Sequence, residues 1–209
     1  MDSSVSTQEK ILGCGKQEFL QNGFQNASLR NIASAAGLTT GAIYGYFKDK
    51  NALFEAIVDP VCKQVERMFT DLSTSYYNNT GIVGEITLQG TIDDLHKIYG
   101  FIYENFDVFR LLVSCAEGSS KADYVHTIVG YEVAHTLLYL DRMEKEKGMK
   151  AKLNKTLIHI ISDSYINAIL EPVRHNLSYE QAIENLDFLC TFYTGGWNCV
   201  FHKLFEGGA

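Results

Sequence analysis

The clearest chemistry in the sequence lies in a short run of small polar and phenolic residues, Thr39-Thr40-Gly41-Ala42-Ile43-Tyr44-Gly45-Tyr46. Hydroxyls at the N-terminus of a helix can pair with base edges in a major groove, and methyl groups there can contact thymine. The phenol hydroxyls of Tyr44 and Tyr46 can reach phosphates. Lys48 and Lys50 follow at the start of another helix, where positive charge and free N–H groups favour a phosphate. The run therefore predicts contact with duplex DNA.

Two short helices joined by a glycine-containing turn are expected to position this run. The first follows Ser28, a residue type that caps helix N-termini, and extends from Leu29 to Ala36. Gly37 suits the left-handed conformation that reverses the chain. Thr39 then caps the second helix, which extends through Tyr46. This spacing predicts a helix-turn-helix.

A longer helix is expected on each side of this pair. The helix before it begins at Ser6, with Glu9 three residues on as in a capping box, and ends at Asn22-Gly23. The helix after it covers about residues 49–77, and Pro60 is expected to kink it.

An ordered set of apolar, glycine and aromatic residues runs through these helices: Ile11-Leu12, Phe19, Gly23-Phe24, Leu29, Ile32-Ala33, Ala36-Gly37-Leu38, Gly41, Ile43-Tyr44, Tyr46-Phe47, Lys50 and Leu53. With this set, residues 7–56 resemble the DNA-binding domain of the TetR (tetracycline repressor) family. The chain departs from the family pattern at Ala27, where a threonine is usual, and at Asn51, where an acid is usual. Gly45, inside the recognition helix, has no side chain to read a base.

The resemblance implies roles for individual residues of the helix-turn-helix. Thr39, Thr40 and Gly41 are expected against bases. Phosphate contacts are expected from Ser28, Arg30, Tyr44, Tyr46, Lys48 and Lys50.

Composition and charge are those of a globular protein that does not coat nucleic acid. The chain has 209 residues and a formal net charge of −7. Residues 1–50 hold five lysines and arginines against four carboxylates, a net of +1, so the remainder carries −8. The N-terminal part is therefore free to approach a polyanion, although the whole chain is acidic.

Strand signals are nearly absent, and the chain beyond residue 90 reads as helices at about 91–105, 107–117, 121–147, 154–175 and 179–205. We therefore expect an all-α protein with two domains. Residues 1–50 would form a three-helix helix-turn-helix DNA-binding domain. Residues 51–209 would form a helical domain that senses a ligand and dimerises.

The last two helices are candidates for a dimer interface. The run 188–193 is apolar nearly all round, which indicates burial on more than one face. A glycine pair in the same helix would allow close backbone approach. We predict a two-fold four-helix bundle with interface residues Ile161, Ile169, Phe192, Gly195 and Gly196.

Aromatic residues are frequent in the middle and late helices, and they suit an apolar ligand pocket as well as an ordinary core. The pocket candidates are Tyr103, Phe109, Tyr131 and Tyr165. The resemblance adds the expectation that a pocket exists in this region.

These features favour a ligand-responsive transcriptional repressor of the TetR family. We expect it to be a homodimer on an inverted-repeat operator, released by a small, largely apolar or aromatic ligand. The alternative is a helical adaptor that acts through protein partners with weak or no specific DNA binding. Ala27 and Gly45 leave this alternative open.

An enzyme is not expected, because the sequence has no nucleophile elbow, P-loop, zinc-protease or dinucleotide-binding motif. Its five cysteines form no C-x-x-C pair, and no catalytic residue, metal or cofactor is predicted. With no signal peptide and no transmembrane stretch, we expect a cytoplasmic protein.

Overall fold

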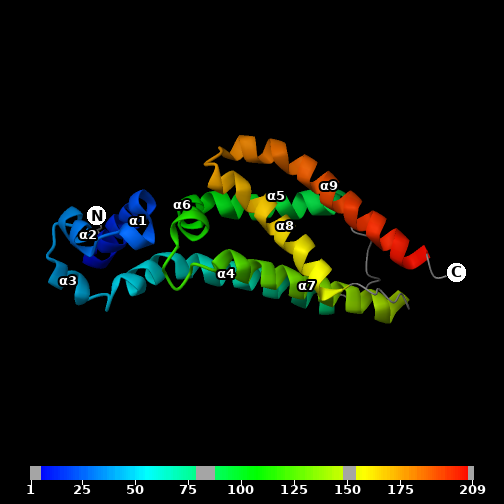
Figure 1. The fold of residues 1–209 in the computed structure, drawn as a ribbon, viewed down its shortest axis with the longest axis horizontal. Helices are drawn as coiled ribbons and strands as arrows, with labels where there is room; N and C mark the ends of the chain where they lie inside the picture. Colours follow the sequence, from blue (N-terminus) through cyan, green and yellow to red (C-terminus); the bar gives the residue numbers. More distant parts are fainter. Residues whose placement is uncertain (1–5, 79–87, 148–153, 207–209) are drawn as a thin grey trace, which may run out of the picture. The chain divides into compact units, whose positions relative to one another are not determined.

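A computed structural model describes residues 6–78, 88–147 and 154–206, and all regular elements in these ranges are helical (Figure 1). This confirms the predicted all-α class. The elements are α1 (Thr7–Asn26), α2 (Leu29–Ala35), α3 (Thr40–Tyr44), α4 (Lys50–Asn78), α5 (Leu88–Glu104), α6 (Phe106–Arg110), the π-helical turn η1 (Leu111–Cys115), α7 (Tyr124–Lys147), α8 (Lys155–Arg174) and α9 (Tyr179–Glu206).

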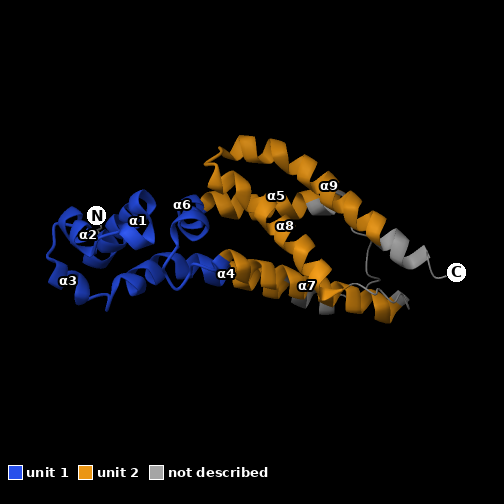
Figure 2. Ribbon diagram, viewed as in Figure 1, with its two compact units in different colours: residues 1–64, 105–124 blue, residues 65–104, 125–209 orange. Residues whose placement is uncertain are grey.

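The chain divides into two compact units (Figure 2). Unit 1 takes its residues from 1–64 and 105–124, and unit 2 from 65–104 and 125–209. Helix α4 therefore contributes to both. The sequence places the functional boundary at residue 50, and that boundary stays a prediction.

Local rules explain the start and the break of α1. The Ser6 hydroxyl accepts from the Glu9 N–H at 3.2 Å, and the Ser6 N–H donates to the Glu9 carboxylate at 2.7 Å, which is the predicted capping box. Gly23, at the predicted end of the helix, has a φ of 69° and interrupts the regular winding.

The helix-turn-helix forms where the sequence predicts it. Gly37 has a φ of 70°, a conformation that strains any residue with a Cβ, and it reverses the chain between α2 and α3. Ile32 and Ala33 of α2 are buried, as are Ile43 and Phe47 at and after α3. These apolar contacts fix the angle between the two short helices.

An aromatic cluster joins α1 to α4, the two helices that flank the helix-turn-helix in unit 1. Phe19 and Phe24 of α1 and Phe54 of α4 have ring centroids 5.1–5.8 Å apart. Each ring is at most 7% exposed. The cluster contributes apolar burial and favourable edge-to-face geometry.

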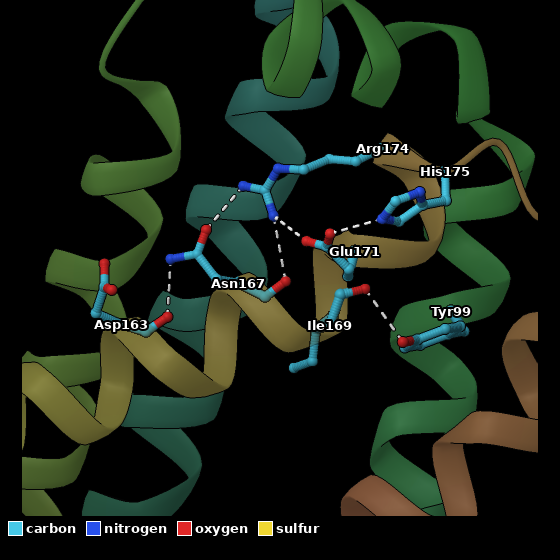
Figure 3. Close-up of polar contacts among 7 residues, drawn as sticks. All are labelled: Tyr99, Asp163, Asn167, Ile169, Glu171, Arg174 and His175. Atoms are coloured by element: carbon cyan, nitrogen blue, oxygen red, sulfur yellow. Dashed lines mark hydrogen bonds and ion pairs between the residues drawn. The ribbon is translucent and has the colours of Figure 1, made fainter.

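In unit 2, α9 packs against α5 and α8. Pro172 lies near the end of α8 and has no N–H, so it cannot donate the helical hydrogen bond to the carbonyl one turn earlier. Side chains bond to carbonyls of that turn, as Figure 3 shows: Tyr99 of α5 donates to the Ile169 carbonyl at 3.1 Å, and Arg174 donates to the Asn167 carbonyl at 3.3 Å. These contacts hold the end of α8 in place beside the proline.

Candidate nucleic-acid interface

The helix-turn-helix presents two phenol rings at its surface. Tyr44 is 55% exposed and Tyr46 is 50% exposed, although both are large partly apolar side chains. A phenol that is not used for packing within unit 1 remains available to a phosphate. Gly41 is exposed and Thr40 is half-buried at the start of α3.

Thr39 caps α3 as predicted. Its hydroxyl accepts from the Ala42 N–H at 3.2 Å. The hydroxyl proton is not used in this bond, so the cap is compatible with donation to a base. Removing the hydroxyl would also release the first turn of the helix.

Ser28 occupies the N-cap position of α2, but its hydroxyl makes no capping bond. The Glu18 carboxylate of α1 instead accepts from the Ser28 backbone N–H at 3.0 Å and from the Asn31 side chain at 3.2 Å. Glu18 thus joins α1 to the start of α2, a contact that the sequence pattern did not indicate.

Lys50 holds backbone carbonyls of its own unit. Its ammonium donates to the Gln25 carbonyl at 2.9 Å and to the Ala27 carbonyl at 3.1 Å. It also lies 4.7 Å from the centre of the Phe24 ring. Lys50 therefore stabilises the end of α1, a role that sequence reasoning missed. Its predicted phosphate contact stays a prediction, as do those of the exposed Arg30 and Lys48.

A segment distant in the sequence, residues 105–124, completes unit 1. Asp107 of α6 pairs with Lys16 of α1 at 3.1 Å. The loop before α7 approaches the end of α1, because a Cβ on Gly118 would lie 2.8 Å from the Gln25 side chain. Gly118 also has a φ of 82°, a conformation that strains any residue with a Cβ.

The same loop bonds to one face of α4. The Ser120 N–H donates to Asn51 at 2.9 Å, and its hydroxyl donates to Glu55 at 2.8 Å. Lys121 pairs with Asp59 at 2.7 Å. Burial lowers the pKa of Lys121, but the hydrogen bond and charge of Asp59 outweigh it and raise the pKa above its ordinary value. We call residues 116–123 the latch loop.

The four predicted pocket residues are divided between the units. Phe109 is 3% exposed in the core of unit 1. The other three belong to unit 2. Tyr103 donates to the Leu177 carbonyl at 3.0 Å, Tyr131 packs on Phe69 with ring centroids 5.6 Å apart, and Tyr165 packs on Tyr193 at 4.9 Å.

The predicted interface residues have different environments on α8 and α9. Ile169 is 5% exposed, so it has little surface to offer a partner, whereas Phe192 is 72% exposed. Gly195 and Gly196 are exposed, and an added Cβ would meet nothing within 4 Å at either position. A surface hollow of about 220 Å³ between the two helices is lined by Ile160, Ile161, Ser164, Phe192, Tyr193, Gly196 and Trp197.

Comparisons with known proteins agree with this architecture. Residues 11–57 match the model of the family described as bacterial regulatory proteins, tetR family. The repressor AcnR of Corynebacterium efficiens is 34% identical over 190 residues, which is 91% of this chain and 94% of AcnR. The chain belongs to the TetR family. It is a transcriptional regulator with a DNA-binding helix-turn-helix domain and a helical C-terminal domain.

Two further similarities are more limited, the first in length and the second in sequence identity. The repressor BepR of Brucella suis is 42% identical over 55 residues, so the match spans about a quarter of either chain (26%). The crystal structure of native NalD, described as the secondary repressor of a multidrug efflux pump in Pseudomonas aeruginosa, has a TM-score of 0.63 at 18% identity. The structural match covers 91% of this chain and 96% of NalD, and it shows that the TetR fold extends over both units.

Two kinds of feature are absent from residues 6–78, 88–147 and 154–206. No group of three or more histidine, cysteine or acidic side chains there could hold a metal ion. No helix in the same ranges has the length and apolar content needed to cross a membrane.

Proposed function

We propose that this regulator is a homodimeric repressor that binds an inverted-repeat operator and leaves it when a small, largely apolar or aromatic ligand binds. The observation that carries the proposal is the exposed pair Tyr44 and Tyr46 beside the capped helix α3. Surface phenols and helix N-terminal hydroxyls match phosphate positioning and base readout, respectively.

The dimer part of the proposal is supported by the outer face of α8 and α9. Four large apolar side chains, Leu157, Ile160, Phe188 and Phe192, are between 43% and 79% exposed there. Soluble monomers rarely leave such a set in water. A second copy that covers this face would place two recognition helices at a fixed separation, and successive major grooves on one side of DNA are about 34 Å apart.

Ligand control is supported by the course of the chain. The latch loop and α6 belong to unit 1, whereas the residues on both sides of 105–124 belong to unit 2. Helix α4 also contributes to both units. A ligand that favours one arrangement of unit 2 can therefore bias unit 1 through continuous backbone, to the extent of its differential affinity for the two states.

Selection from random duplex DNA with the purified full chain tests this proposal at about physiological salt. An enriched inverted repeat with half-sites one helical turn apart, or a multiple of that distance, is the expected result. No enrichment, even at low salt, would contradict it and favour the adaptor alternative, in which the same fold acts through protein partners.

A further inference from the structure

Serine precedes three of the described helices, α1, α2 and α9. Ser6 and Ser178, before α1 and α9, each form a complete capping box with the residue three positions on. In each box the serine hydroxyl accepts a backbone N–H and the serine N–H donates to a side chain, at 2.7–3.3 Å. The hydroxyl of Ser28, before α2, makes no capping bond. The start of α2 is therefore held in another way.

A carboxylate from α1 takes the place of the local partner at the start of α2. In a capping box the side chain of the third helical residue accepts the N–H of the N-cap residue. The third residue of α2 is Asn31, whose side chain instead donates to Glu18 Oε1 at 3.2 Å. The same oxygen accepts the Ser28 N–H at 3.0 Å, across ten positions of sequence. One oxygen atom of Glu18 therefore ties the first turn of α2 to α1.

The backbone of Ser28 shows why its hydroxyl does not cap. Its ψ is 120°, whereas ψ is 154° at Ser6 and 155° at Thr39, two N-caps whose hydroxyls accept the N–H three residues on. Its φ is −114°, against −62° and −86° at those two residues. These rotations turn the Cβ of Ser28, and with it the hydroxyl, relative to the first turn of α2. Because Glu18 bonds to the Ser28 N–H, it fixes this rotated backbone.

The Ser28 side chain is only half-buried, so its hydroxyl can reach a partner outside unit 1. A hydroxyl can donate one hydrogen bond, and this one has no capping bond to give up when it turns to a phosphate. Arg30, exposed and two residues on, supplies positive charge at the same end of α2. The start of α2 is thus built without the group that is expected to touch DNA.

We propose that Glu18 is a positioning residue for DNA binding, which fixes the backbone of Ser28 so that its hydroxyl serves a phosphate instead of the helix. Without the Glu18 oxygen, Ser28 can rotate to the geometry of Ser6 and cap α2 with its hydroxyl. The hydroxyl is then no longer directed to DNA. This inference rests on the proposed operator-binding repressor and adds a residue that does not itself contact the operator.

Operator binding by the full chain tests the proposal, with Ser28→Ala introduced into three backgrounds. The backgrounds are wild type, Glu18→Gln, which keeps one carbonyl oxygen as acceptor, and Glu18→Met, which keeps none. Fluorescence anisotropy with the selected operator measures each dissociation constant. We expect Ser28→Ala to weaken binding about threefold or more in the wild-type and Glu18→Gln chains. In Glu18→Met it should weaken binding by less than about 1.5-fold.

A comparison of the two Glu18 variants separates position from charge, because both lack the carboxylate charge. Glu18→Met should bind the operator more weakly than Glu18→Gln by about the factor that Ser28→Ala causes in the wild-type chain. Gln17→Met is the matched control at the neighbouring, exposed position of α1. In that background Ser28→Ala should have its full wild-type effect.

Urea unfolding without DNA, at one fixed protein concentration, should show the reverse pattern. Ser28→Ala should leave the midpoint of the wild-type chain unchanged, since the hydroxyl makes no capping bond there. In Glu18→Met the released hydroxyl caps α2, so Ser28→Ala should lower the midpoint by about 0.3 M or more. Ser178→Ala removes a hydroxyl that does cap, and it is the positive control.

The outcomes distinguish this inference from the proposed function. If Ser28→Ala weakens operator binding equally in the Glu18→Met and wild-type chains, the positioning role is wrong and the repressor stands. The same holds if Glu18→Gln behaves like Glu18→Met, or if Ser28→Ala shifts the urea midpoint equally in all backgrounds. If the wild-type chain binds no duplex, even at low salt, the proposed repressor is wrong and the DNA role of Glu18 is lost with it.

Discussion

Lys50 stabilises the fold of unit 1, although the family pattern suggests that its side chain contacts DNA. Its two bonds to the carbonyls of Gln25 and Ala27 close the end of α1. We expect Lys50→Met, which keeps the apolar stem, to lower the free energy of unfolding by about 1 kcal/mol. Lys48→Met, at an exposed lysine two residues earlier, should change it by less than about 0.5 kcal/mol. Urea unfolding at one fixed protein concentration measures both, and equal midpoints would contradict the structural role.

The exposed phenols allow a second prediction at this scale. Tyr44→Phe combined with Tyr46→Phe should weaken operator binding about fivefold or more, because each lost hydroxyl bond is worth about 0.5–1.5 kcal/mol and two are worth about 1–3 kcal/mol. A neutral hydroxyl releases no counterion, so the slope of log K against log salt should stay unchanged. If Lys48 contacts a phosphate, Lys48→Met should reduce that slope by about 0.9. Tyr179→Phe, at an exposed tyrosine of unit 2, is the control. Unchanged operator affinity in the double variant would show that neither phenol hydroxyl contacts DNA.

Glu132 of α7 makes the stability of the chain depend on pH. Burial raises its pKa from 4.5 to about 7 in the folded chain, so between these values the folded state holds a proton that the unfolded state has lost. Stability contributed by this group is therefore present below pH 4.5, falls as the pH rises to about 7 and is then constant. The difference is about 2–3 kcal/mol, and Glu132→Gln should remove it. Chemical unfolding at pH 5 and pH 8 measures this difference in the wild-type chain and in Glu132→Gln. An equal pH dependence of stability in the two proteins would contradict the raised pKa of Glu132.

At the scale of elements, the latch loop makes the contact between distant segments testable. Lys121 and Asp59 lie 2.7 Å apart and are only 24% and 35% exposed, whereas Lys97 and Asp94 are 75% and 62% exposed. A double-mutant cycle with Lys121→Met and Asp59→Asn should give a coupling free energy of about 1 kcal/mol. The matched cycle at Lys97 and Asp94 should give less than about 0.5 kcal/mol. Equal couplings would show that the latch pair is solvated like an ordinary surface pair.

The helices of unit 1 could be predicted from local sequence rules. The contacts that could not be predicted join residues far apart in the sequence. The Ser6–Glu9 capping box, the break at Gly23 and the turn at Gly37 depend on residues within one helical turn, so they can be seen in sequence. The Lys50 contacts join residues 23 and 25 positions apart, and the latch loop meets α4 across 65 and 69 positions. No periodicity signals such a pairing. The same limit explains why aromatic composition grouped Phe109 with tyrosines that belong to the other unit.

At the scale of the whole molecule, the proposed dimer interface on α8 and α9 would determine whether one chain or two reads the operator. An acid at Phe192, which is 72% exposed and lines the hollow, would put a charge into the centre of the proposed interface, where an unpaired charge is most costly. We expect Phe192→Glu to convert the dimer to a monomer in sedimentation velocity. His96→Glu, which places the same acid at an exposed position of α5, should leave the dimer intact.

The consequence for DNA follows from coupling between half-sites. Two linked recognition helices bind an inverted repeat far more tightly than one, because the second contact is made at high effective concentration. The Phe192→Glu chain should therefore bind the full operator no better than a single half-site, while its unit 1 keeps the same affinity for that half-site. A monomer that still prefers the full repeat would place the dimer contact elsewhere, and a variant that stays dimeric would exclude the α8–α9 face as the interface.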